Sequence, residues 1–211
     1  MWLENILIQT YFASATFIVG VIVLPRLYFV DKLILIVVAS NILIDIYTTY
    51  LSYQHINTMF FNSVFTSYEQ ALILYIYSYF KNEKIYKTGL LILCVGLIQF
   101  SVYNLTSLQG VNRFNTFTFV PTALIIAVLS YFNVRQLIIS ENLVFQKTSF
   151  WFSVANFQYY IIVAPVMSAV LWANEISINL GVSLKQINNI SYCIWAILIA
   201  IGFLCQKKKT I

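Results

Sequence analysis

The sequence predicts an all-α membrane protein, a seven-transmembrane-helix bundle with its N-terminus outside and its C-terminus cytoplasmic. First, the 211 residues are 61% hydrophobic and 9% charged, with a mean hydropathy of +0.84, whereas about a quarter of the residues in soluble domains are charged. Second, seven apolar runs are long enough to cross a bilayer, which takes about 20 residues. Third, the basic residues gather in alternate connections between these runs.

The seven runs use most of the chain, so we expect a single transmembrane domain over residues 1–211 and no separate soluble domain. Charge, proline or polar clusters bound each run. The runs lie at about 5–24, 33–53, 59–80, 88–106, 115–134, 149–173 and 187–206.

The first run is expected to be a retained helix, because a signal peptide needs a basic segment ahead of its apolar run and no cation precedes Arg26. The second run contains Asn41 and Asp45 near its middle. The third run is the most polar, but removing it would leave the apolar residues 71–80 without a place. We therefore keep all three as spans.

The fourth run follows a lysine-rich connection. The fifth and sixth runs contain Pro121 and Pro165, which permit a kink where they free a backbone carbonyl. The connection 135–148 mixes apolar and charged residues, which suits a short stretch lying at the membrane surface. The seventh run has no lysine between Ile187 and Gln206, which excludes the Schiff base of a retinal protein.

Orientation follows from the twelve Lys and Arg residues. Ten of them fall in the odd-numbered connections or at the C-terminus, and only Arg113 and Lys185 fall in the others. Because cytoplasmic loops carry the excess of Lys and Arg, the odd-numbered connections are predicted to be cytoplasmic. Trp2, Trp151 and Trp172 near the predicted interfaces suit an aromatic belt.

Two acidic residues, Asp45 and Glu69, fall inside predicted spans. A charged group at the bilayer centre costs about 2.5–3.5 kcal/mol on insertion scales, so such residues usually face the bundle interior. If the turn between the two helices is centred on Asn57, each acid lies twelve positions from it. That places both about 18 Å below the turn, at one level near the midplane.

Polar residues accompany both acids at helical spacing, so each helix presents a polar stripe toward a shared interior. Further helices are expected to contribute Gln99 and Asn156, and also Asn104, Thr118, Thr122, Tyr160, Asn189 and Tyr192. The candidate polar or ligand site therefore consists of Asp45, Glu69, Asn41, Thr48, Asn62, Thr66, Gln99 and Asn156.

No Lys or Arg lies at this depth, so the carboxylates have no cationic partner in the sequence. Two interpretations stay open. The acids are either protonated members of a structural hydrogen-bond network between helices, or they form a site for a proton, a metal cation or a positively charged ligand.

Other chemistry is not favoured by the sequence. The basic residues sit at helix ends, which argues against nucleic-acid binding. His55 is the only histidine and has no nearby cysteine, which argues against a zinc site. No GxSxG, P-loop or Gly-x-Gly-Asp motif is present. We therefore expect no enzyme activity, no catalytic residues and no cofactor.

Several short motifs resemble a group of small, uncharacterised seven-helix membrane proteins of Bacteroidetes-type bacteria, which are associated with genes for sensor histidine kinases. These motifs are Ser40-Asn41, Glu69, Phe150-Trp151-Phe152 with Tyr159-Tyr160, and Asn188-Asn189, Tyr192 and Cys205 before the final lysines. The resemblance implies a signalling setting and a histidine kinase as partner. It supplies no substrate.

Three functions remain as hypotheses. The first is a multi-pass protein of the bacterial cytoplasmic membrane that acts as a sensory or accessory signalling component through a separate cytoplasmic partner. The second is a small proton- or cation-coupled transporter or channel that uses Asp45 and Glu69. The third is a structural or assembly subunit, in which the carboxylates only join helices.

Overall fold

Seven α-helices build the protein. A computed structural model describes residues 8–81, 83–110, 114–140 and 143–206, apart from the side chains at 170–176 and at 178. Over these residues the helices are α1 Ile8–Ile22, α2 Phe29–Tyr53, α3 Met59–Tyr77, α4 Lys84–Tyr103, α5 Thr116–Ser140, α6 Thr148–Ile176 and α7 Ile178–Cys205. Short helical turns lie at Leu24–Arg26, Asn104–Leu108 and Val144–Gln146.

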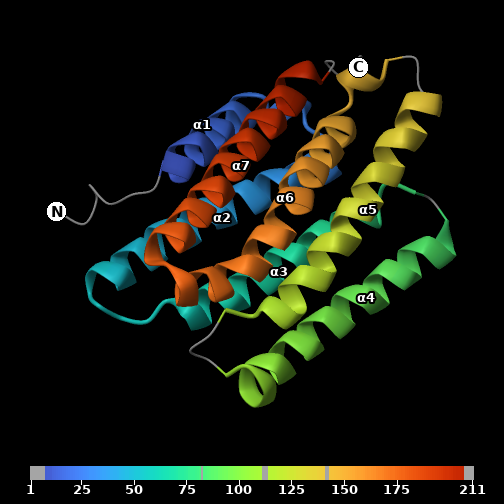
Figure 1. The fold of residues 1–211 in the computed structure, drawn as a ribbon. Coiled ribbons are helices and arrows are strands. Elements are labelled where there is room, and N and C mark those ends of the chain that lie inside the picture. Colours follow the sequence, from blue (N-terminus) through green and yellow to red (C-terminus); the bar gives the residue numbers. More distant parts are fainter. Residues whose placement is uncertain (1–7, 82, 111–113, 141–142, 207–211) are drawn as a thin grey trace.

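The helices form two layers. Figure 1 shows α1, α7, α6 and α5 side by side in that order, with α2 and α3 behind them and α4 at the edge beside α3. Since α1 packs against both α2 and α7, and α3 packs against α5, the layers enclose a common interior. The α2–α3 turn lies at one end, here called the turn end, and the α3–α4 connection lies at the other, here called the basic end.

Local sequence explains several of the helix boundaries. Pro25 occupies the short turn that separates α1 from α2, and α2 then begins with a reciprocal capping box between Tyr28 and Asp31. At the far end of α2, His55 has a φ of 58° in the turn that leads to α3. Gly110, with a φ of 78°, follows the π-helical turn after α4, where a residue without a Cβ carries no steric cost.

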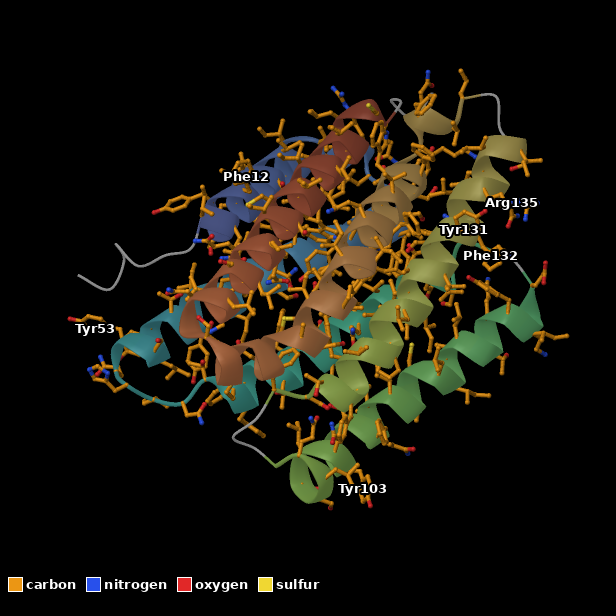
Figure 2. All side chains as sticks on the ribbon, viewed as in Figure 1. Phe12, Tyr53, Tyr103, Tyr131, Phe132 and Arg135 are labelled. Atoms are coloured by element: carbon orange, nitrogen blue, oxygen red, sulfur yellow. The ribbon has the colours of Figure 1, made fainter. Side chains whose placement is uncertain are left out.

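The surface is rich in apolar and aromatic side chains, and the interior holds polar side chains among apolar ones. Figure 2 shows outward-pointing aromatic side chains, among them Phe12, Tyr103, Tyr131 and Phe132, and all four are exposed. Buried positions include many polar side chains, such as Asn104, Asn156 and Ser153, which are 0% exposed. Four helices, within Lys84–Leu108, Thr116–Ser140, Thr148–Ala169 and Asn179–Cys205, are long and apolar enough to cross a membrane, and α1 is a shorter apolar helix.

The prediction of helices from apolar runs is confirmed in number and wrong at several ends. We expected the fifth helix to stop near 134 and the seventh to start near 187, but α5 continues to Ser140 and α7 begins at Ile178. The predicted surface stretch 135–148 is therefore helical for its first six residues. Apolar runs report the part of a helix that suits hydrocarbon, whereas exposed polar residues such as Lys185 and Gln186 prolong a helix beyond it.

Charge is distributed unevenly between the two ends. Seven of the eight Lys and Arg among the described residues lie at or near the basic end, and Lys185 is the exception. The predictions that concern Trp2, Arg113 and the lysines at 207–209 lie outside the described residues, as does the side chain of Trp172.

The basic end also holds a buried acid, Asp31. Asp31 is 5% exposed and accepts hydrogen bonds from the Tyr28 backbone N–H at 2.9 Å and from Gln206 Nε2 at 2.6 Å. The start of α2 is thereby tied to the end of α7.

Candidate functional site

Helix α2 directs a polar stripe into the interior toward the turn end. Asn41 is buried at 3% exposure, while Asp45 and Thr48 are half-buried. On the same helix, the buried residues between Asp31 and Asn41 are all apolar and include Ile34 and Val38. The polar part of α2 therefore occupies only the half of the interior that faces the turn end.

Glu69 of α3 lies against this stripe. The Asn41 Nδ2 group donates a hydrogen bond of 2.9 Å to Glu69 Oε1, so Asn41 and Glu69, two predicted site residues, are in contact. We had placed Asp45 and Glu69 at one level. The structure pairs Glu69 with Asn41 instead, which offsets the two acids by about one helical turn.

Asp45 is bound by α1. Thr10 Oγ1 donates to Asp45 Oδ2 at 3.1 Å, and Gln9 Nε2 approaches the two carboxylate oxygens at 3.3 and 3.4 Å. Neither Gln9 nor Thr10 was predicted from the sequence as a partner of Asp45. A signal was present, because Thr10, Ala13, Thr16 and Gly20 form a buried stripe of small residues on α1, and such stripes mark close helix packing in membranes.

Tyrosines of α6 and α7 form the wall opposite the carboxylates. The rings of Tyr159 and Tyr192 meet edge to face at 5.9 Å, and Tyr192 stacks on Trp195 at 5.3 Å. Both tyrosines lie in the same part of the interior as Asp45 and Glu69. Five helices thus contribute to one polar cluster, which we call the acidic site: Gln9, Thr10, Asn41, Asp45, Glu69, Tyr159 and Tyr192.

The acidic site has an excess of oxygen acceptors. The Tyr192 hydroxyl lies beside the Asn41 amide, yet within the described part of the chain neither this hydroxyl nor Asn41 Oδ1 has a hydrogen-bond partner of good geometry. Gln9 Oε1 is likewise unpaired there. Since an unpaired buried polar group costs about 1–3 kcal/mol, these oxygens are suited to a ligand that accepts lone pairs.

The sequence supplies no internal cation for these oxygens. Helices α1, α3 and α6 contain no Lys or Arg, and α2 contains none after Lys32. Two carboxylates together with amide and phenol oxygens are the donors that hard cations prefer, at a coordination number of about six to eight for Ca²⁺. The arrangement is chemically suited to binding a small cation.

Three further predicted residues lie on the polar faces but bond within their own helices. Thr48 Oγ1 donates to the Ile44 carbonyl at 2.8 Å, and Thr66 Oγ1 donates to the Asn62 carbonyl at 2.7 Å. The Asn62 amide approaches Thr58 Oγ1 at 3.4 Å. These groups are half-buried, and their hydrogen bonds are local.

Gln99 does not join the polar interior. Helix α4 packs through Leu90, Cys94, Leu97 and Ser101, which recur at helical spacing, and Gln99 is exposed on the opposite face. Including it among the site residues was therefore wrong. Polarity alone did not reveal which face of this peripheral helix meets the bundle.

Asn156 belongs to a different network, nearer the basic end. It accepts a hydrogen bond from Trp195 Nε1 at 2.9 Å and donates to the Tyr77 hydroxyl at 3.5 Å. Tyr77 also bonds Ser130 at 2.7 Å, and Asn133 donates to Ser153 at 2.7 Å. This Tyr77–Asn156 network joins α3, α5, α6 and α7 below the acidic site.

A third network secures the turn end of α4 and α5. The Ser67 and Ser101 hydroxyls are 2.6 Å apart, Asn115 Nδ2 donates to Ser101 Oγ at 2.8 Å, and Asn104 bonds Asn115. Asn104 and Thr118, expected in a shared interior, lie here. The network holds the connection after α4 against α3, which is a structural task.

Comparison with known proteins gives no relative from which a role could be transferred: no protein family, no characterised protein and no solved structure matches the chain.

Proposed function

We propose that this protein is a seven-span component of the bacterial cytoplasmic membrane that binds a small cation at the acidic site and serves as a sensory or accessory signalling protein. The observation that carries the proposal is the cluster of two carboxylates with unpaired buried oxygens at Asn41, Gln9 and Tyr192. The number of spans, the orientation and the signalling role are parts of the proposal.

The proposed topology rests on charge and length. Seven of the eight described cations lie at or near the basic end, which we place in the cytoplasm because cytoplasmic loops carry the excess of Lys and Arg. Helices α2 and α3 are not among the four helices that are both long and apolar enough to cross a membrane, and they are the helices that carry Asp45 and Glu69. Lining a polar interior accounts for their lower apolarity.

Access to the acidic site is proposed from outside. Asp45 lies eight residues from the end of α2, about 12 Å along the helix. Toward the basic end the interior is packed with buried side chains, both apolar ones such as Ile34, Leu74 and Phe152 and those of the Tyr77–Asn156 network. A cation that enters from outside would therefore meet a closed inner half, which favours detection over passage.

We propose that the signal is transmitted by movement of the helices that hold the cation. Gln9, Asp45 and Glu69 belong to α1, α2 and α3, and their oxygens would draw together around a cation. The cytoplasmic ends of these helices would move, and a separate partner would sense the movement. The sequence resemblance makes a histidine kinase the expected partner.

Cation- or proton-coupled transport is the second candidate. It is favoured by the depth of Glu69, ten residues from the start of α3, because intramembrane acids often carry the coupling ion. A structural role is the third possibility, since Thr10–Asp45 and Asn41–Glu69 also join helices.

The first experiment measures thermal unfolding of the purified protein in detergent while Na⁺, K⁺ or Ca²⁺ replaces N-methylglucamine at constant ionic strength. A bound cation should stabilise the protein by about 2.7 kcal/mol at 100 times its Kd. Asp45→Asn and Glu69→Gln should abolish this gain. Glu83→Gln removes a charge from an exposed residue at the start of α4 and should retain it.

Two further measurements separate the roles. A histidine kinase recovered stoichiometrically with the tagged protein from its own membranes would support signalling. Uptake of the stabilising cation into proteoliposomes that Asp45→Asn abolishes would place transport first. Absence of cation stabilisation, together with near-normal stability of both acid variants, would leave the structural role.

A further inference from the structure

A second site lies on the outer surface of α5, away from the acidic site. Its first part is a hollow of about 330 Å³ between α5 and α6, lined only by apolar and aromatic residues: Leu124, Ala127, Val128, Tyr131, Phe132, Phe157 and Ile161. Tyr131 also borders a second hollow of about 290 Å³, whose other lining residues are Val134, Arg135, Ile138 and Ile139. The two hollows are neighbours along α5 and have Tyr131 in common, and together they are called the groove.

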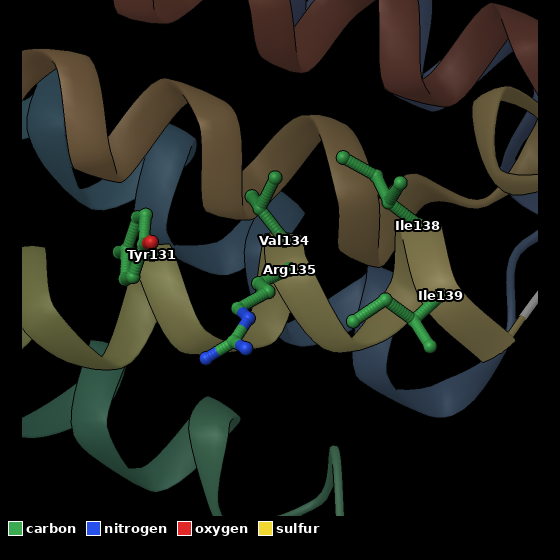
Figure 3. A pocket seen from close by; sticks show the side chains of 5 residues that line it. All are labelled: Tyr131, Val134, Arg135, Ile138 and Ile139. Carbon is green, nitrogen blue, oxygen red and sulfur yellow. The ribbon is translucent and has the colours of Figure 1, made fainter.

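One cation, Arg135, lies near the basic end of this groove. Figure 3 shows the Arg135 side chain between those of Tyr131 and Ile139, on one stretch of α5. Arg135 lies five residues before the end of α5, about 8 Å along the helix. The groove therefore has an apolar length toward the turn end and a guanidinium group near the basic end.

Helix α4 leaves this side of α5 accessible. The Asn104–Asn115 contact holds α4 and α5 together at the turn end, and Figure 1 shows the two helices drawing apart toward Lys84 and Ser140. The surface that faces this widening space includes Val128, Tyr131 and Phe132, which are 53%, 50% and 52% exposed.

We propose that this groove binds an anionic phospholipid of the cytoplasmic leaflet, with an acyl chain along Leu124, Val128 and Tyr131 and the headgroup phosphate at Arg135. The polarity of the groove matches such a lipid: hydrocarbon meets apolar side chains, and a planar guanidinium binds phosphate oxygens through paired hydrogen bonds. Basic pockets between helices on the cytoplasmic side are a known form of headgroup recognition. The inference is independent of the acidic site, and it rests on the proposed topology, which places the basic end in the cytoplasm.

The test is native mass spectrometry of the whole protein, released from detergent after incubation with phosphatidylglycerol or with phosphatidylcholine of the same chains. The wild type should retain the anionic lipid preferentially. Arg135→Gln should weaken that retention about fivefold, the effect of one cation near an anionic surface. Arg26→Gln removes an equally exposed cation from the same end on a different segment and should change retention little.

Each alternative result overturns the proposal. Equal losses in Arg135→Gln and Arg26→Gln would indicate general attraction to the basic end. Equal retention of the two lipids by the wild type would indicate an unselective lipid coat. Full competition by soluble glycerol phosphate would show an anion site that does not use the apolar groove.

A second variant tests the apolar part. Val128→Trp places a large ring in the hollow without changing charge, and it should reduce retention of the anionic lipid while thermal unfolding stays near that of the wild type. Retention unchanged by Val128→Trp would remove the acyl chain from the groove and contradict the proposal.

Discussion

At the scale of single residues, the interior depends on hydrogen bonds that few alternative side chains could satisfy. Asn156 is fully buried and serves two partners, accepting from the Trp195 indole and donating to the Tyr77 hydroxyl. Because the Trp195 indole N–H donates to Asn156 Oδ1, the loss of Asn156 would leave this buried donor unpaired.

Asn156→Leu is therefore expected to lower the free energy of unfolding by about 1–3 kcal/mol, the cost of a buried donor without an acceptor. Gln99→Leu likewise replaces a side-chain amide by leucine, but on the exposed face of α4. It should leave the free energy of unfolding almost unchanged. Denaturant or thermal unfolding in detergent measures both. Equal destabilisation by the two variants would show that Gln99 does contact the interior.

Sequence reasoning found part of the acidic site and missed the rest for a physical reason. Asp45, Glu69 and Asn41 were found because carboxylates and amides in an apolar run are costly unless they face inward. Gln9, Thr10 and Tyr159 were missed, since which helix faces meet depends on packing between distant segments. Composition and periodicity describe each helix separately.

At the scale of helices, two glycines lie where neighbouring helices approach each other closely. A Cβ on Gly202 of α7 would stand 2.9 Å from the Trp151 Cβ of α6, and one on Gly20 would meet Leu35 and Phe203. The Trp151 Cβ is fixed to the backbone, so it cannot move aside by changing its rotamer.

Gly202→Ala is expected to destabilise the protein by about 1–3 kcal/mol, the usual cost of overpacking. Gly96→Ala is the matched control, because a Cβ there meets nothing within 4 Å, and alanine is the better helix former by about 0.5–1 kcal/mol. The two changes should shift the unfolding temperature in opposite directions. A stabilising Gly202→Ala would contradict the close approach of α6 and α7.

Helix number was predictable and helix length was not. Seven apolar runs predicted seven helices, and the described residues form seven, because an apolar environment favours segments that satisfy their own backbone hydrogen bonds. The ends of α5 and α7 were misplaced because a charged residue, Arg135 or Lys185, interrupts the apolar run while the helix continues. In such regions, apolar content does not indicate the residue at which a helix ends.

At the scale of the whole molecule, the open question is the direction in which the chain crosses the membrane. The basic end carries seven of the eight described cations, and our proposal places it in the cytoplasm. Single cysteines at the two ends test this directly, in a background where Cys94, Cys193 and Cys205 are replaced by serine.

In intact cells, His55→Cys in the α2–α3 turn should react with a membrane-impermeant maleimide. Ile85→Cys, at an 89% exposed position in the first turn of α4, should react only after the cells are permeabilised. Labelling in the reverse order would invert the proposed orientation, and with it the side from which a cation reaches Asp45.

The connection between α6 and α7 limits which parts of the bundle are able to move. Only Ser177, in an extended conformation, separates the two helices, and one residue spans at most about 3.6 Å. The joined ends of α6 and α7 therefore stay together, and the hairpin presents Tyr159 and Tyr192. We expect an opening of the acidic site to come mainly from α1, α2 and α3, so that the acids are displaced relative to the tyrosine wall.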